Sequence, residues 1–193
     1  GAGTLVLTAN NSNTSVVNGT ALYFGGNIVV TGGNLSFGSD TNLGNANTSV
    51  ATVGTIDLAG GALNPTANIT LSSNRSILIG NSTVFNGSIN VNSGNVLTYN
   101  AGISDAPGSS GDMLILNGNG TLILTSNAST FDGGVSINSG TLNITFNSTN
   151  LTAAAADAVL GAPSGNITFG GNGTLLSGNV LDIQAARTIS ILN

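Results

Sequence analysis

Short apolar runs of four to six residues alternate with polar segments along the whole chain. They are rich in Val, Ile, Leu and Thr and are bounded by Gly, Asn or Ser, which is typical of β-strands. The runs lie at 4–8, 27–31, 67–71, 76–80, 88–92, 95–99, 113–116, 121–125, 141–146, 166–169 and 187–192. The pattern predicts an all-β protein.

The polar segments carry strong turn signals, because Gly and Asn tolerate positive φ. Gly-Gly occurs at 25–26, 32–33, 60–61, 133–134 and 170–171, and Asn-Gly at 18–19, 86–87, 117–118 and 119–120. One segment departs from this pattern. Residues 152–163, TAAAADAVLGAP, carry Thr152 as an N-cap, Gly161 as a C-terminal stop and Pro163 beyond it. They predict a turn or two of helix on a loop.

The chain repeats itself. GAGTLVLTAN at 1–10 aligns with GNGTLILTSN at 118–127, and NRSILI at 74–79 aligns with ARTISI at 186–191. We therefore expect one domain over 1–193, a β-solenoid with a first repeat copy of about 1–117 and a partial second copy of about 118–193. Strand spacing predicts about 20–30 residues per coil and about 7–9 rungs, stacked at the usual inter-strand distance.

Charge is unusually scarce, at 5 % of residues, with seven Asp set against Arg75 and Arg187. Without clustered cations, nucleic-acid binding is excluded. The chain has no Cys and no His, which excludes disulfides and the usual zinc, copper and iron sites. No apolar run is long enough for a membrane helix. The first residues lack the basic start of a signal peptide, so if the protein is exported, its signal peptide has already been removed. Neutral faces suit stacked coils, and stacked Asn side chains can form hydrogen-bonded ladders.

Asn-x-Ser/Thr triplets, the acceptors of N-glycosylation, are abundant. A solenoid with Asn at its turns and Thr in its strands would also create them without modification, so both interpretations stay open. The glycosylation candidates are Asn10, Asn13, Asn18, Asn34, Asn47, Asn74, Asn81, Asn86, Asn119, Asn127, Asn143, Asn147, Asn150 and Asn172. We expect two further triplets, at Asn68 and Asn166, to face inward and to stay unmodified.

No catalytic, cofactor or metal residue is assigned. The acidic residues Asp40, Asp57, Asp105, Asp112, Asp132, Asp157 and Asp182 are at least seven positions apart and form no D-x-D calcium loop. We expect them to be isolated and solvated. Arg75 and Arg187 precede equivalent strands of the repeat, so each is expected to tie together corner carbonyls or a nearby Asp. A Ser-His-Asp arrangement is impossible without His.

The segment GNGTLILTSNASTFDGGVSINSGTLNI at 118–144 resembles the passenger-associated repeat of bacterial autotransporters. Phe131 stands where that repeat usually has Tyr, and Asp132 and Val135 stand where Thr is common. Segments 43–63, 74–79, 160–175 and 186–191 follow the same family order. The resemblance implies a right-handed parallel β-helix, exported to the cell surface, in which the repeat is structural. No translocator barrel is present, and 193 residues is short for a passenger.

These observations favour an extracellular, non-enzymatic structural protein: a rigid cell-surface or matrix solenoid that stacks head-to-tail into filaments through its terminal strands. The partner would be another copy of the chain, with no nucleic acid, no membrane span and no cofactor. One alternative is an adhesin passenger fragment whose loop 100–112 binds surface glycans or neighbouring cells. The other is a carbohydrate-active β-helix, which would need Asp residues of different rungs in one groove.

Overall fold

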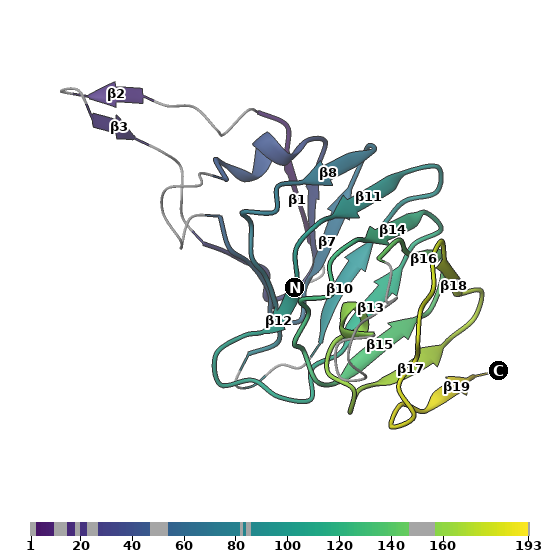
Figure 1. Cartoon of the computed structure of the whole chain (residues 1–193). Helices are drawn as coiled ribbons and strands as arrows, with labels where there is room; N and C mark the ends of the chain where they lie inside the picture. Colours follow the sequence, from purple (N-terminus) through teal and green to yellow (C-terminus); the bar gives the residue numbers. More distant parts are fainter. Residues whose placement is uncertain are drawn as a thin grey trace.

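The computed structural model describes residues 3–9, 15–17, 20–22, 27–46, 54–81, 83, 86–146 and 157–192. Their strands form three parallel sheets and one antiparallel pair. Successive strands of the chain alternate between the parallel sheets, so the chain coils as a parallel β-helix, as predicted (Figure 1). Among the described residues no helix is long and apolar enough to cross a membrane.

One sheet runs along the whole described coil, and the other two cover parts of it. The eight-stranded sheet has the order β1 (Thr4–Leu7), β5 (Asn34–Phe37), β7 (Ala62–Pro65), β10 (Gly87–Asn90), β13 (Leu114–Asn117), β15 (Gly134–Ile137), β17 (Asn166–Phe169) and β19 (Ile189–Ile191). The five-stranded sheet has β18 (Thr174–Ser177), β16 (Thr141–Ile144), β14 (Thr121–Leu124), β11 (Val96–Tyr99) and β8 (Ile69–Leu71). The four-stranded sheet has β12 (Ile103–Asp105), β9 (Ile77–Ile79), β6 (Ile56–Leu58) and β4 (Ile28–Val29). The antiparallel pair, β2 (Ser15–Val17) and β3 (Thr20–Leu22), stands away from the coils (Figure 1).

The eight strands of the longest sheet define eight rungs, within the predicted range. The distance between strand starts varies from 20 residues, between Leu114 and Gly134, to 32, between Gly134 and Asn166. β1 and β19 are the two edges of this sheet, and the parallel register runs unbroken from one to the other.

The core is a set of aliphatic columns, because in-register strands place equivalent inward side chains on top of one another. One column runs through the eight-stranded sheet as Leu5, Leu35, Leu63, Ile89, Leu116, Ile137, Phe169 and Ile191. Leu97, Leu122 and Leu142 form a second column and are fully buried. Stacked apolar contacts, rather than one globular centre, therefore stabilise the fold.

The outer face of the eight-stranded sheet carries the expected amide ladder only in part, as three separate hydrogen bonds, and Asn64 Oδ1 and Asn90 Oδ1 have no hydrogen-bond partner among the described residues. The Asn64 side chain donates to the Ser36 hydroxyl at 3.1 Å, and Asn138 donates to Asn117 at 3.0 Å. Asn90 donates to Asn34 at 3.2 Å. These cross-rung bonds use neutral groups that stack without repulsion, which accounts for the shortage of charge on this face.

All eleven predicted runs contain a strand. The pattern did not mark β2, β3, β5, β6, β7, β12, β15 and β18. Of these, β5, β6, β7, β12 and β15 contain Asn, Asp, Pro or Gly, which have weak strand preference. In a coil, backbone hydrogen bonds to the strands of the neighbouring coils compensate for the weak intrinsic strand preference of these residues.

The predicted helix is only a single 3₁₀ turn in its described part, η3 (Ala158–Leu160). Gly161 ends it with φ 84°, as expected of a glycine stop, and Thr152 lies outside the described residues. A second 3₁₀ turn, η1 (Asp40–Leu43), was not predicted and ends at Gly44 with φ 87°. The two turns lie at different places in the coil: η1 precedes a strand of the four-stranded sheet, β6, and η3 precedes a strand of the eight-stranded sheet, β17.

Candidate functional sites at the corners and ends

Arg75 is a fully buried side chain between β8 and β9. Its Nε donates to Asp40 Oδ1 at 2.7 Å. Nη1 donates to the Leu43 carbonyl at 3.1 Å, and Nη2 donates to the Gly44 carbonyl at 2.6 Å. One guanidinium thus serves the C-terminal carbonyls of η1 that the turn itself leaves without partners.

Arg187 repeats this arrangement at the corner of η3. Its Nε donates to Asp157 Oδ2 at 2.5 Å, and Nη2 donates to the Gly161 carbonyl at 2.7 Å. The Asp side chain also accepts a backbone N–H in each corner, from Ser72 at Asp40 and from Gln184 at Asp157. These contacts confirm the predicted structural role of both arginines.

Tyr99 supports the Arg75 corner from the next rung. Its hydroxyl donates to the Arg75 carbonyl at 2.6 Å, and its ring is fully buried. Burial raises the pKa of Tyr99 to about 12. The phenol therefore stays protonated and keeps its hydrogen bond at any physiological pH.

The expectation of isolated, solvated carboxylates is wrong. Asp112 and Asp157 are fully buried, and Asp40 and Asp157 are paired with arginines. Asp105 and Asp112 come from one coil and Asp132 from the next; the three are named here the acidic corner, and Asp132 and Asp112 both act electrostatically on Asp105. Positions 105 and 132 are about one coil apart, so the helical pitch brings together residues that are distant in sequence.

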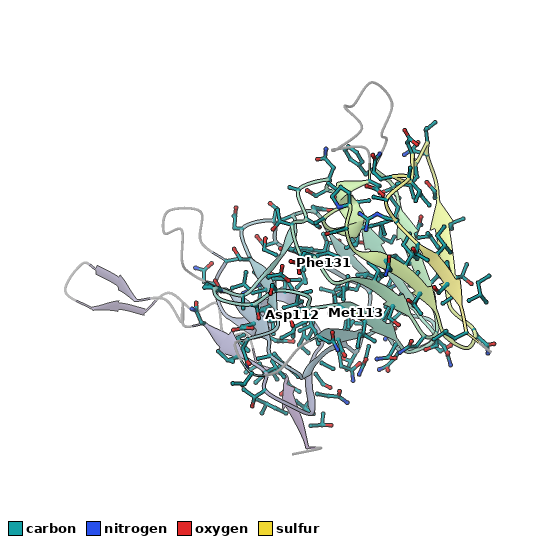
Figure 2. All side chains as sticks on the ribbon, turned by 90° about the horizontal axis from the view of Figure 1, so that it is seen from below. Asp112, Met113 and Phe131 are labelled. Carbon is teal, nitrogen blue, oxygen red and sulfur yellow. The ribbon has the colours of Figure 1, made fainter. Side chains whose placement is uncertain are left out.

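The carboxylates of the acidic corner hold backbone groups. Asp105 Oδ2 accepts the Asp132 N–H at 3.1 Å, and Asp132 Oδ1 accepts the Gly111 N–H. Asp112 Oδ1 accepts the Asn86 N–H at 3.3 Å, while its other oxygen is buried without a hydrogen-bond partner. Asp112 lies among the buried side chains in the middle of the molecule (Figure 2). Among the described residues no group of three or more acidic side chains has the arrangement of a metal site.

Two carboxylates have raised pKa values. Burial, followed by the charge of Asp132, raises the pKa of Asp105 to about 6, and Asp112 adds a smaller repulsion. Burial also raises the pKa of Asp57. In both cases the folded coil favours the protonated acid.

The raised pKa of Asp105 predicts that stability falls as pH rises. The folded chain holds this proton up to a pH of about 6, whereas the unfolded chain releases it near 3.8, so the stabilisation is complete below 3.8 and is lost on passing through 6. Solvent screening reduces the effect to about 1 kcal/mol. Thermal unfolding followed by circular dichroism between these two pH values checks the prediction, and a melting temperature that rises with pH would contradict it.

The inward-facing assignment of two glycosylation triplets is wrong. Asn68 and Asn166 are exposed, and their side-chain oxygens accept the N–H groups of Val96 and Thr188 at 2.8 and 3.2 Å. Each lies beside the start of a strand in the next coil, where its side-chain oxygen accepts a backbone N–H. An amide that faced the apolar interior would have no such partner.

The other triplets stay predictions. Asn74, Asn119 and Asn172 are exposed, and Asn34, Asn81, Asn86, Asn127 and Asn143 are partly buried. Asn10, Asn13, Asn18, Asn47, Asn147 and Asn150 lie outside the described residues.

Segment 100–112 is only partly a loop, because β12 occupies Ile103–Asp105 within it. Its exposed part is a turn in which the Ser109 N–H donates to the Ala106 carbonyl at 2.9 Å. Pro107, Gly108 and Ser110 are exposed. The acidic corner lies at the base of this turn.

Both ends of the eight-stranded sheet expose side chains that belong to the core columns. Leu5 on β1 is 60 % exposed and Ile191 on β19 is 78 % exposed, whereas Leu63 in the same column is fully buried. A hollow of about 420 Å³ opens at the β1 end, lined by Leu5, Ile28 and neighbouring residues. Within the described residues, core-column side chains on both edge strands, β1 and β19, are therefore exposed to solvent.

Comparison with known proteins supports the resemblance seen in the sequence. Searches of curated proteins and of solved structures found no match. Residues 114–144 match the family model of the passenger-associated-transport-repeat. This segment spans β13 to β16, two successive coils that share a parallel register with β10 before them and β17 after them. Residues 114–144 are thus similar to a passenger-associated-transport-repeat and lie within a longer β-helix.

Proposed function

We propose that this protein is a rigid, non-enzymatic structural rod displayed outside the cell. The observation that carries the proposal is the unbroken register of eight rungs around aliphatic columns. Continuous ladders and stacked cores resist bending, which suits a spacer or scaffold. The matched repeat family is associated with surface passengers, and the near absence of Lys and Arg leaves trypsin-like proteases few cleavage sites.

The contacts within the acidic corner support a structural role over a hydrolytic one. Asp105 and Asp132 both accept backbone N–H groups, and these bonds fix the corners. Glycoside hydrolysis would require one free acid and one free base facing a substrate. The carbohydrate-active alternative would need Asp residues of different coils close together. Such a cluster is present here, but the backbone hydrogen bonds of its carboxylates account for it.

The exposed core-column side chains on β1 and β19 support head-to-tail association of copies. Leu5 and Ile191 are the two ends of one core column, so stacking β19 of one copy on β1 of the next would continue that column in register. An edge strand with free N–H and C=O groups favours such pairing. Because the two contacting surfaces differ, the association does not close and produces a filament.

Replacing Ile191 by Lys is expected to abolish filament growth, because a charge would be buried at the junction. The matched control is Ser190→Lys, which adds the same charge on the adjacent position of β19, pointing to the opposite face. Sedimentation velocity and negative-stain microscopy over a range of concentrations give the readout. Wild-type protein that stays monomeric at the highest concentration would exclude filament formation. Equal loss of filaments in both variants would exclude this junction.

A further inference from the structure

We propose that the acidic corner is a proton-operated lock on the turn at 106–111. This inference does not depend on filament formation. Asp105 immediately precedes the turn, and Asp112 immediately follows it. Asp132, from the next coil, holds the turn through the Gly111 N–H. The three carboxylates therefore lie at the entrance, the exit and the anchor of one short segment.

The corner is short of positive charge. The ionisable groups that act on Asp105 are Asp132 and Asp112, both acidic. The two arginines of the chain are engaged at other corners, with Asp40 and Asp157. Full ionisation thus places three like charges around the turn with no cation to balance them, and the repulsion acts on the hydrogen bonds that fix it.

Packing prevents the corner from relaxing inward. Asp112 is fully buried, and a Cβ built on Gly80 would lie 1.9 Å from Asp112 Oδ2. The Asp112 carboxylate is therefore pressed against the end of β9. Asp105 is fixed on the other side by the ladder between β12 and β9. Pro107 and Gly108 at the tip of the turn are exposed, so we expect any movement to occur there.

Proton binding removes one charge and lets Asp105 share a hydrogen bond with Asp132. The turn is then held in acid and loosened at neutral pH, with the change centred near the pKa of Asp105, at about 6. The device needs only a proton as its ligand. It gives an otherwise rigid rod one pH-sensitive surface segment.

Hydrogen–deuterium exchange on the full chain tests the lock. Exchange is measured at about pH 5 and about pH 7.5, corrected for intrinsic rates, on peptides that cover 100–113. Protection of residues 106–111 is expected to fall on the order of 10-fold at the higher pH. Protection of β10 and β11 serves as the internal control and is expected to change less.

Asp105→Asn is expected to keep the turn protected at both pH values, since the amide still accepts the Asp132 N–H without a charge. Asp132→Asn, which keeps an acceptor for the Gly111 N–H, provides the same readout should the first variant fail to fold. Asp182→Asn, which removes an exposed carboxylate, is expected to retain the wild-type response. A wild-type turn with equal protection at both pH values, or a pH response that survives in both corner variants, would overturn the proposal. So would recovery of protection at neutral pH in about 1 mM calcium, which would identify a cation site instead.

Discussion

Replacing Arg75 by Met is expected to lower the free energy of unfolding by about 3 kcal/mol, the lower end of the cost of breaking a buried ion pair, because Asp40 is partly exposed. Met retains most of the aliphatic stem but none of the donors. Asp40 loses its charge partner, and the carbonyls of Leu43 and Gly44 lose the N–H groups that satisfy them. Urea titration followed by circular dichroism measures the loss.

Arg187→Met is the matched control. Arg187 makes the same contacts with Asp157 and Gly161, but it precedes the last described strand, β19. Since coils contact mainly their neighbours, its loss is expected to unfold the end locally and to reduce the cooperative transition less. A loss below about 1 kcal/mol for Arg75→Met would show that the corner does not depend on its guanidinium.

Gly134→Ala is expected to cost about 3 kcal/mol or more, because the position combines positive φ with contact to the next rung. Gly134 has φ 89°, and an added Cβ would lie 2.1 Å from the Asn166 carbonyl oxygen. That atom belongs to the backbone of β17, so it cannot move without displacing the coil. Thermal unfolding is expected to show a lower melting temperature.

Gly108→Ala separates the two causes. Gly108 has φ 83°, but nothing lies within 4 Å of an added Cβ. Its cost is expected to be about 1 kcal/mol, that of the left-handed backbone alone. Equal losses at the two positions would mean that the close approach of the rungs at Gly134 contributes nothing.

Much of the fold could be predicted because every coil of a solenoid has the same local sequence pattern. Apolar runs such as 121–125 and 141–146 predict strands, and Gly or Asn between the runs predicts turns. Copies such as 74–79 and 186–191 indicate a repeated unit. The number of rungs followed from spacing alone.

The site chemistry was harder to predict, because it depends on coil length. Asp105 and Asp132 meet only because about one coil separates them, and coils vary by more than ten residues. The same uncertainty hid the pairing of Arg75 with Asp40, which are 35 residues apart in the sequence. Asn68 was wrongly expected to face inward, because the sequence pattern of a strand does not show whether the residue at its start points into the core or toward solvent.

Parallel, in-register stacking of the rungs is the central claim, and engineered disulfides test it most directly. The chain has no Cys, so Ser88→Cys with Ile115→Cys introduces one pair at positions that face each other between β10 and β13. Partners in adjacent strands lie within disulfide reach, whereas Ser88→Cys with Asn117→Cys is displaced by two residues. Mild oxidation followed by non-reducing electrophoresis and peptide mapping is expected to show rapid crosslinking of the first pair and little of the second. Crosslinking of the displaced pair in preference to the matched pair would contradict the stacked β-helix.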